Sequence, residues 1–176
     1  MNKYIVLLKG INVGGHKKVL MAELRELLSN TNFQNVQTYI QSGNLILESP
    51  EKDVKKLKLH MQNAIKNHFG FEISVLIKTP KEFQQIFNAC PFPKDIKQLS
   101  YFVILDDAPN KDLLNDASVK IYDGELYEII NDCIYFYFEK GFGQSKFNIN
   151  FFERKLNTIG TARNFKTMVK LLSLST

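Results

Sequence analysis

Residues 4–18 of the chain read YIVLLKGINVGGHKK. The first five of these residues are apolar, and a short apolar run of this length is typical of a buried strand. Residues 21–28 follow, and their apolar side chains recur at 21, 24, 27 and 28, which is the spacing of one helix face. We therefore predict that a loop with three glycines, residues 10–18, joins a strand to the beginning of a helix.

This loop supports two interpretations. The backbone N–H groups of a glycine-rich loop can approach an anion closely, and the N-terminus of the next helix adds partial positive charge. Lys17 and Lys18 stand beside that positive end, where a bound anion would offset an unfavourable cation. Glycines equally serve tight turns that need a positive φ. The anion site and the structural turn therefore both stay open.

Two nucleotide-binding signatures fail in this loop. Gly10 and Gly15 have the G-x-x-x-x-G spacing of a phosphate-binding loop, but His16 stands where lysine is required and Lys18 where serine or threonine is required. Asn12 stands where the dinucleotide-binding pattern needs its second glycine. The loop therefore predicts no reaction by itself.

The next two strands are predicted over residues 36–40 and 45–48, which are rich in β-branched and other apolar side chains. Residues 41–44 read QSGN and predict the turn between these strands. Ser49 and Pro50 predict the N-cap and the first position of a second helix.

Gly70 predicts the C-cap of that helix, and residues 72–78 predict a fourth strand. The resulting order, β-α-β-β-α-β, is that of a ferredoxin-like unit, whose antiparallel sheet has the first and third strands in the middle. Chain direction then brings the loop at 10–18, the turn at 41–44 and the link near residue 70 to one end of the sheet. Both faces of the first strand are apolar, so we predict that the second half covers the face without helices.

The second half begins with Thr79, Pro80 and Glu82, which predict a capping box and a helix that extends to about residue 89. Strands are predicted over residues 101–105, 119–122, 125–130 and 133–138, and helices near residue 112, over 148–156 and over 164–172. We therefore predict an α+β chain of two ferredoxin-like (α/β-plait) halves with antiparallel sheets. The halves are residues 1–79 and residues 80–176, the second with extra C-terminal helices.

Composition narrows the class of protein. The chain has 176 residues, of which 44% are hydrophobic, and this suits one domain or two small ones with a hydrophobic core. No apolar run approaches the roughly 18 residues of a membrane span, and the start of the chain lacks the pattern of a signal peptide. We therefore expect a cytoplasmic protein that does not associate with membranes.

The cysteines and histidines suggest no metal chemistry. Cys90 and Cys133 make neither a disulfide framework nor a C-x-x-C motif. The three histidines, at positions 16, 60 and 68, have no metal-ligand spacing with those cysteines. We expect neither a metal nor another cofactor.

The net charge of +5 permits an anionic or polyanionic partner. Residues 140–147, KGFGQSKF, match an RNA-recognition signature at positions 140–143 and at Phe147, but Gln144 and Ser145 stand where an aromatic and an apolar residue are needed. We interpret the aromatic residues 135–138 as core rather than as a base-stacking platform. A single-stranded RNA-binding module stays an alternative function, and a protein-interaction module is another.

Two further segments of the second half carry polar residues of interest. Ser145 and Lys146 lie in a second glycine-rich connection, and Thr161 is the predicted N-cap of the last helix. Arg163 then lies at the start of that helix, where a cation is disfavoured unless an anion or a carboxylate pairs with it. The sequence shows no recognisable set of a catalytic nucleophile, base and acid, so it leaves open whether the protein is an enzyme.

Taken together, these blocks give a chain that resembles an uncharacterised bacterial family, domain of unknown function 1697. The matching blocks, in order, are residues 9–15, 21–25, 39–44, 143 with 145–146, and 161 with 163–164. The resemblance implies two α/β-plait halves and no mechanism, since the family has no assigned biochemical role.

The chain departs from this family's pattern at several positions. Lys9, Gln144 and Phe165 stand where the family leads us to expect Arg, Arg and Trp, and residues 157–158 read NT in place of LG. The loss of two arginines weakens a bidentate grip on an anion at these loops.

The functional hypothesis from the sequence is a binding site for a small phosphate- or carboxylate-bearing ligand, a nucleotide among the options, at the end of the first sheet. The candidate ligand-binding residues are Gly10, Asn12, Gly14, Gly15, Lys17, Ser42, Asn44, Ser145, Lys146 and Arg163. The last three would join only if the second half folds over that end. His16 is the sole candidate for a general base.

Overall fold

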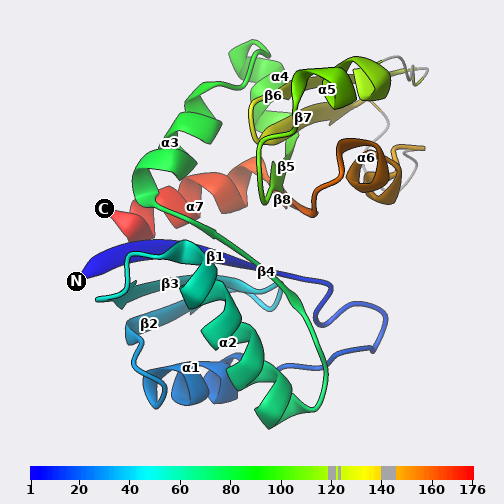
Figure 1. Cartoon of the computed structure of the whole chain (residues 1–176). Helices are drawn as coiled ribbons and strands as arrows, with labels where there is room; N and C mark the ends of the chain where they lie inside the picture. The colour runs from blue at the N-terminus through cyan, green and yellow to red at the C-terminus, as the bar shows by residue number, and fades with distance from the viewer. Residues whose placement is uncertain (119–121, 123, 140–145) are drawn as a thin grey trace. The chain divides into compact units, whose positions relative to one another are not determined.

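The computed structural model describes residues 1–118, 122, 124–139 and 146–176 (Figure 1). It divides into two compact units, of which the first is residues 1–84 with 170–176 and the second is residues 85–169. In the described residues each unit contains a four-stranded antiparallel sheet with helices. The predicted α+β class is therefore confirmed.

The first unit has the predicted strand order. Its elements are β1 (Asn2–Lys9), α1 (Met21–Ser29), β2 (Gln34–Tyr39), β3 (Asn44–Ser49), α2 (Val54–Phe69) and β4 (Ser74–Lys78). The sheet order is β2-β3-β1-β4, and every neighbouring pair is antiparallel. The first and third strands are thus central, and α1 and α2 lie on the same side of the sheet (Figure 1).

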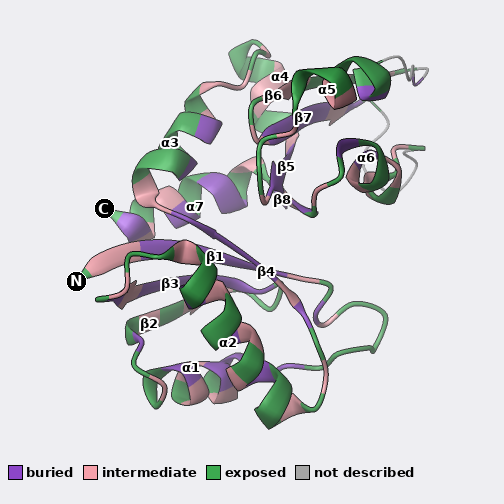
Figure 2. Ribbon diagram, in the orientation of Figure 1, coloured by how far each residue is buried: buried purple, intermediate pink, exposed green. Residues whose placement is uncertain are grey.

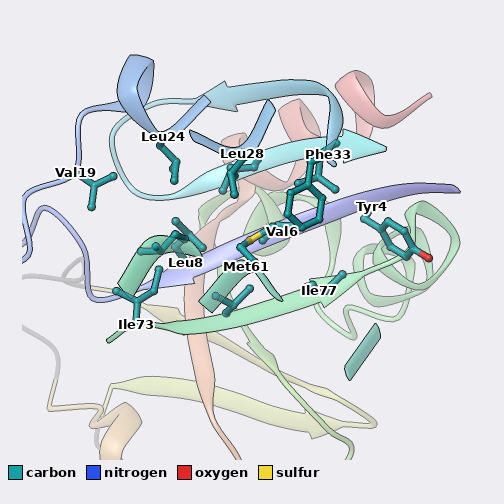
Figure 3. Packing of buried hydrophobic residues seen from close by; sticks show 14 of the residues in the cluster. Tyr4, Val6, Leu8, Val19, Leu24, Leu28, Phe33, Met61, Ile73 and Ile77 are labelled. Atoms are coloured by element: carbon teal, nitrogen blue, oxygen red, sulfur yellow. The ribbon is translucent and has the colours of Figure 1, made fainter. Parts of the chain in front are cut away.

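The core of the first unit follows from the alternation of side chains along β1. Tyr4, Val6 and Leu8 point toward the helices and pack in one cluster with Leu24 and Met61 (Figure 3). Side chains of this size each contribute roughly 1.5–3 kcal/mol when they are fully buried. The residues between them on β1 are buried as well, so both faces of the strand are removed from solvent (Figure 2).

The predicted start of the second helix at Ser49 and Pro50 is wrong. Strand β3 continues through Ser49, and α2 begins at Val54. Asp53 is the N-cap, because its Oδ1 accepts hydrogen bonds from the backbone N–H groups of Lys55 and Lys56, at 2.9 and 3.3 Å. The predicted C-cap is confirmed, since Gly70 has φ 79° and its N–H donates to the Lys66 carbonyl.

The second unit repeats the topology of the first. The remaining elements are α3 (Pro80–Asn88), α4 (Lys94–Leu99), β5 (Tyr101–Leu105), α5 (Lys111–Ser118), β6 (Glu125–Ile130), β7 (Cys133–Phe138), α6 (Ile149–Leu156), β8 (Gly160–Asn164) and α7 (Phe165–Ser175). The sheet order is β6-β7-β5-β8, in which β5 takes the place of β1. Both halves are therefore ferredoxin-like, as predicted.

The division between the units runs through α3, and the last turns of α7 belong to the first unit. The predicted capping box of α3 is present: Glu82 Oε2 accepts the N–H of Thr79 at 2.7 Å, and Thr79 Oγ1 accepts the N–H of Glu82 at 3.2 Å.

The predicted helix over residues 164–172, with Thr161 as its N-cap, needs correction at its start. Thr161 and Arg163 lie in strand β8, where they pair with Ile104 and Phe102 of β5. The N-cap role falls to Asn164, whose Oδ1 accepts the N–H of Thr167 at 2.9 Å. Residues 160–164 pair with the edge of β5, and no local sequence pattern in these residues predicts that pairing. The predicted strand at 119–122 lies largely outside the described residues.

One buried hydroxyl in the second unit supports a stability prediction. Tyr135 is almost fully buried, and its hydroxyl donates to the Ile86 carbonyl in the last turn of α3 at 2.7 Å. Burial raises the pKa of Tyr135 above its ordinary value, so the hydroxyl keeps its proton. Tyr135→Phe is expected to lower the free energy of unfolding by about 1–2 kcal/mol, because the buried carbonyl loses its donor.

Denaturant unfolding of the second unit measures this loss. Tyr137→Phe on the same strand is the matched control, since Tyr137 is only half-buried, and we expect a change below about 0.5 kcal/mol. Equal losses in the two variants would contradict the role assigned to the Tyr135 hydroxyl.

Candidate functional site

The loop at residues 10–18 folds as a small β-hairpin. The N–H of Asn12 donates to the Lys17 carbonyl at 3.2 Å, and the N–H of His16 donates to the Val13 carbonyl at 3.0 Å. Gly14 and Gly15 form the tip, with φ values of 57° and 78°. This is the pattern of a type I′ turn, in which both central residues have positive φ. Turn geometry therefore accounts for these two glycines.

Asn12 ties the base of the hairpin to the rest of the first unit. Its Nδ2 donates to the carbonyls of Val19 and Gln41, at 2.9 and 2.8 Å, and its Oδ1 accepts the N–H of Val19 at 2.8 Å. Gln41 lies in the turn between β2 and β3. The predicted juxtaposition of the two loops at one end of the sheet is thus confirmed.

The turn at 41–44 is braced in the same way. Asn44 is fully buried, and its Nδ2 donates to Ser42 Oγ at 2.9 Å and to the Tyr39 carbonyl at 3.1 Å. The N–H of Leu8 donates to the Gly43 carbonyl at 2.7 Å, which joins the end of β1 to this turn. The amides of Asn12 and Asn44 therefore act first as supports of the loops.

The basic side chains of the hairpin lie at its exposed surface. His16, Lys17 and Lys18 are exposed, and Lys17 Nζ donates to the Glu72 carbonyl at 2.7 Å. The link between α2 and β4 therefore reaches the same end of the sheet, as predicted. Lys66 Nζ lies 2.7 Å from Glu72 Oε1, and this hydrogen bond and its charge lower the pKa of Glu72, with a smaller contribution from Lys17.

Helix α1 begins beside the hairpin without a side-chain cap. Leu20 occupies the N-cap position and makes no side-chain hydrogen bond to the first turn. Glu23, in that first turn, instead pairs with His68 at the end of α2, with 2.7 Å between Oε1 and Nε2. Helix ends present N–H groups that need acceptors, so this end is open to water or to a ligand anion.

Comparison with known sequences places the chain in a family. The sequence pattern of the family described as "Protein of unknown function (DUF1697)" matches residues 1–135. The chain belongs to this family. No curated protein matches it.

A solved structure has the same fold as this DUF1697 protein. It is the conserved bacterial protein SP0830 from Streptococcus pneumoniae, with a TM-score of 0.78 and 23% sequence identity. The match covers 99% of this chain and 98% of that one. At this level of identity the likeness establishes the architecture of two plaits, and it carries no assignment of a ligand.

Two candidate residues of the second unit, Lys146 and Arg163, make hydrogen bonds to neighbours in that unit. The N–H of Lys146 donates to Glu125 Oε1 at 2.9 Å. Arg163 is buried in β8, and its Nη1 donates to Thr161 Oγ1 and to the Ala162 carbonyl, at 2.8 and 2.7 Å. Burial lowers the pKa of Arg163 to about 10, so the side chain stays cationic at neutral pH. Ser145 lies outside the described residues.

Three of the four aromatic residues of β7 belong to the core, as we predicted from the sequence. Tyr135, Phe136 and Phe138 are buried. Phe147, the last residue of the partial RNA-recognition signature, stacks on Phe136 with 3.8 Å between ring centroids and on Phe152 with 4.8 Å. Most of that signature, residues 140–145, lies outside the described residues. The rings that are described serve packing in the second unit.

Across the described ranges, no group of three or more His, Cys, Asp or Glu side chains is arranged to hold a metal ion. Of the helices within those ranges, none has both the length and the apolar character that crossing a membrane requires.

Sequence reasoning missed the roles of Glu23, His68 and Glu72. Their partners lie 6 to 55 residues away in sequence, on other elements or in the loops between them. No spacing in the sequence signals such contacts. The ferredoxin-like topology is the one signal that places residues near 70 at the hairpin end of the sheet, where these contacts form.

Proposed function

We propose that this DUF1697 protein binds a small phosphate- or carboxylate-bearing ligand, a nucleotide among the options, over the hairpin of residues 10–18. The observation that carries the proposal is a braced hairpin that presents His16, Lys17 and Lys18 to solvent beside an α1 N-terminus without a side-chain cap. A cation and a helix N-terminus repel each other, and an anion between them interacts favourably with both.

The hairpin offers donors of two kinds. Among the described residues, the amides of Gly14 and Gly15 donate to no protein acceptor, so a ligand oxygen can accept from them. The Lys17 ammonium donates one hydrogen bond to the Glu72 carbonyl, and its other N–H groups can donate to a ligand. Asn12, which holds the hairpin base, then contributes by pre-organising these donors. Lysine acts as a point charge, so several contacts are needed for affinity.

A thermal-shift panel of nucleotides and sugar phosphates tests the proposal. A ligand present at about 100 times its dissociation constant stabilises the folded protein by about 2.7 kcal/mol, which is a measurable rise in midpoint. Lys17→Ala and Lys18→Ala are expected to reduce that rise, because each removes a cation from the hairpin. Lys81→Ala, at an exposed position in α3, is the control and is expected to respond like the wild type.

Two results of the panel would contradict the proposal. One is a flat response to every compound. The other is an equal response in the hairpin variants and the wild type. Poly-U, included as a further probe, identifies the RNA alternative if it raises the midpoint while the small anions do not.

A further inference from the structure

A hollow lies at the end of the first unit opposite the hairpin. Its volume is about 320 Å³, and it is lined by the chain between α1 and β2, the end of β3 and the first half of α2. Figure 3 shows Phe33, one of its lining residues, beside Tyr4, whereas Val19 and Leu8 mark the end of the core nearer the hairpin. This hollow therefore lies apart from the site proposed above.

The size and lining of the hollow limit what it can hold. Ligand pockets in proteins measure roughly 300–1,000 Å³, so this one is at the lower end and suits a single ring with a substituent. Phe33 and Leu57 line it, and each is only 3% exposed. Both belong to the core cluster of the first unit, so this apolar surface is held in place by packing.

The rim carries one lysine and one glutamate. Lys56 and His60 are four residues apart on α2, both exposed, and both line the hollow. Glu51 also lines it, but its Oε1 accepts the backbone N–H groups of Lys52 and Asp53, at 2.8 Å each. Among the ion pairs of the described residues, none includes Lys56. The Lys56 ammonium is thus the cation available to a ligand here.

His60 is fixed as part of the wall. Its Nε2 lies 2.8 Å from the Thr31 carbonyl just after α1, so this nitrogen carries the hydrogen and donates. Its ring is tilted at 59° against Phe33, with 5.4 Å between centroids. A planar ring placed in the hollow would therefore meet aromatic and aliphatic surface on one side and a cation at the rim.

We propose that this hollow binds a small planar-ring compound that carries one acidic group. The ring packs against the exposed side chains of Pro50 and His60, with Phe33 and Leu57 supplying the small apolar surface that they expose in the hollow. The acidic group, a carboxylate or a phosphate, pairs with Lys56. This ligand differs from that of the hairpin because the apolar surface contributes to its binding, so a neutral ring compound retains part of the affinity.

An NMR titration of the ¹⁵N-labelled full chain tests the proposal with benzoate, with its neutral analogue benzamide, and with phenyl phosphate. Benzoate is expected to shift the amides of Phe33, Leu57 and His60 saturably, and benzamide to bind about three- to fivefold more weakly. Lys56→Met is expected to weaken benzoate by a similar factor and to leave benzamide unchanged. Tighter binding of phenyl phosphate than of benzoate identifies phosphate as the preferred group, and the reverse identifies carboxylate.

Lys55→Met, at the neighbouring exposed lysine that does not line the hollow, is the matched control. The proposal is overturned if Lys55→Met weakens benzoate as much as Lys56→Met does, if benzamide binds as tightly as benzoate, or if no amide of the hollow shifts. Shifts confined to residues 10–18 would overturn it as well, while supporting the hairpin site.

Discussion

Gly43→Ala is expected to destabilise the first unit by about 2–4 kcal/mol. Gly43 has φ 76°, which costs an alanine about 1 kcal/mol. A Cβ built there would lie 2.7 Å from Leu8 Cβ, 3.0 Å from Ile11 Cδ1 and 3.2 Å from the Leu8 carbonyl oxygen. Two of these three atoms are fixed by the backbone of β1, so no rotation of a side chain relieves the clash. Overpacking of this kind costs a further 1–3 kcal/mol, roughly.

Replacing Gly15 at the hairpin tip by alanine separates the cost of a positive φ from the cost of steric crowding. Gly15 has φ 78°, and a Cβ there would meet nothing within 4 Å. Gly15→Ala is therefore expected to cost only about 1 kcal/mol. Denaturant unfolding followed through the amide signals of β1 measures both variants in the first unit itself. A loss for Gly43→Ala no greater than that for Gly15→Ala would show that the close approach of the turn to β1 is unimportant.

The topology of the first sheet and the β6–β7 hairpin of the second were predictable from the sequence, because they depend on strong, repeated signals. Residues 4–8 are a continuous apolar run, and residues 125–138 contain two strands with a turn at Asn131, which takes φ 51°. The first residues of helices and the last residues of strands were harder to predict, because several neighbouring side chains can act as the N-cap of one helix. Ser49 and Pro50 form a plausible cap, yet Asp53 holds the first turn of α2, and β3 extends to Ser49.

The candidate site was predictable in position and not in detail. Chain direction in a β-α-β-β-α-β unit places the hairpin near the turn at 41–44 whatever the side chains do. The bonds that join them, from Asn12 to Gln41 and from Leu8 to Gly43, span 29 and 35 residues and depend on side-chain reach. Strand β8 was missed for a similar reason, since its partner β5 lies more than fifty residues earlier.

Each unit has the same backbone hydrogen bond at the end of its first strand, but the loop that follows this strand differs between the units. The N–H of Leu8 donates to the Gly43 carbonyl at 2.7 Å, and the N–H of Leu105 donates to the Asp132 carbonyl at 2.8 Å at the corresponding place in the second unit. This hydrogen bond is therefore a feature of the fold that both units share. Residues 106–110, DDAPN, take the place of the hairpin in the second unit and contain no glycine and no lysine. The shared fold therefore does not require a basic glycine hairpin at this place, and a role in the fold alone does not explain its lysines.

Asn12→Asp is expected to cost the first unit about 2–4 kcal/mol at neutral pH, although the two side chains have nearly the same shape. Nδ2 of Asn12 donates to two carbonyl oxygens within 2.9 Å, and a carboxylate oxygen in its place would be repelled by both. Asn12→Ala removes all three side-chain hydrogen bonds of this residue and is expected to cost about 2–3 kcal/mol. The aspartate variant should thus be at least as unstable as the alanine variant.

The pH dependence distinguishes repulsion from the simple loss of bonds. A carboxyl group that faces two acceptors has a higher pKa in the folded state than in the unfolded one, so its destabilising effect is complete above the folded pKa and diminishes as the pH falls through it. Between pH 8 and pH 4, urea unfolding is therefore expected to show the gap between Asn12→Asp and wild type narrowing, while the gap for Asn12→Ala stays nearly constant. A gap for Asn12→Asp that is independent of pH, or smaller than that for Asn12→Ala throughout, would mean that Asn12 does not hold the hairpin through its amide.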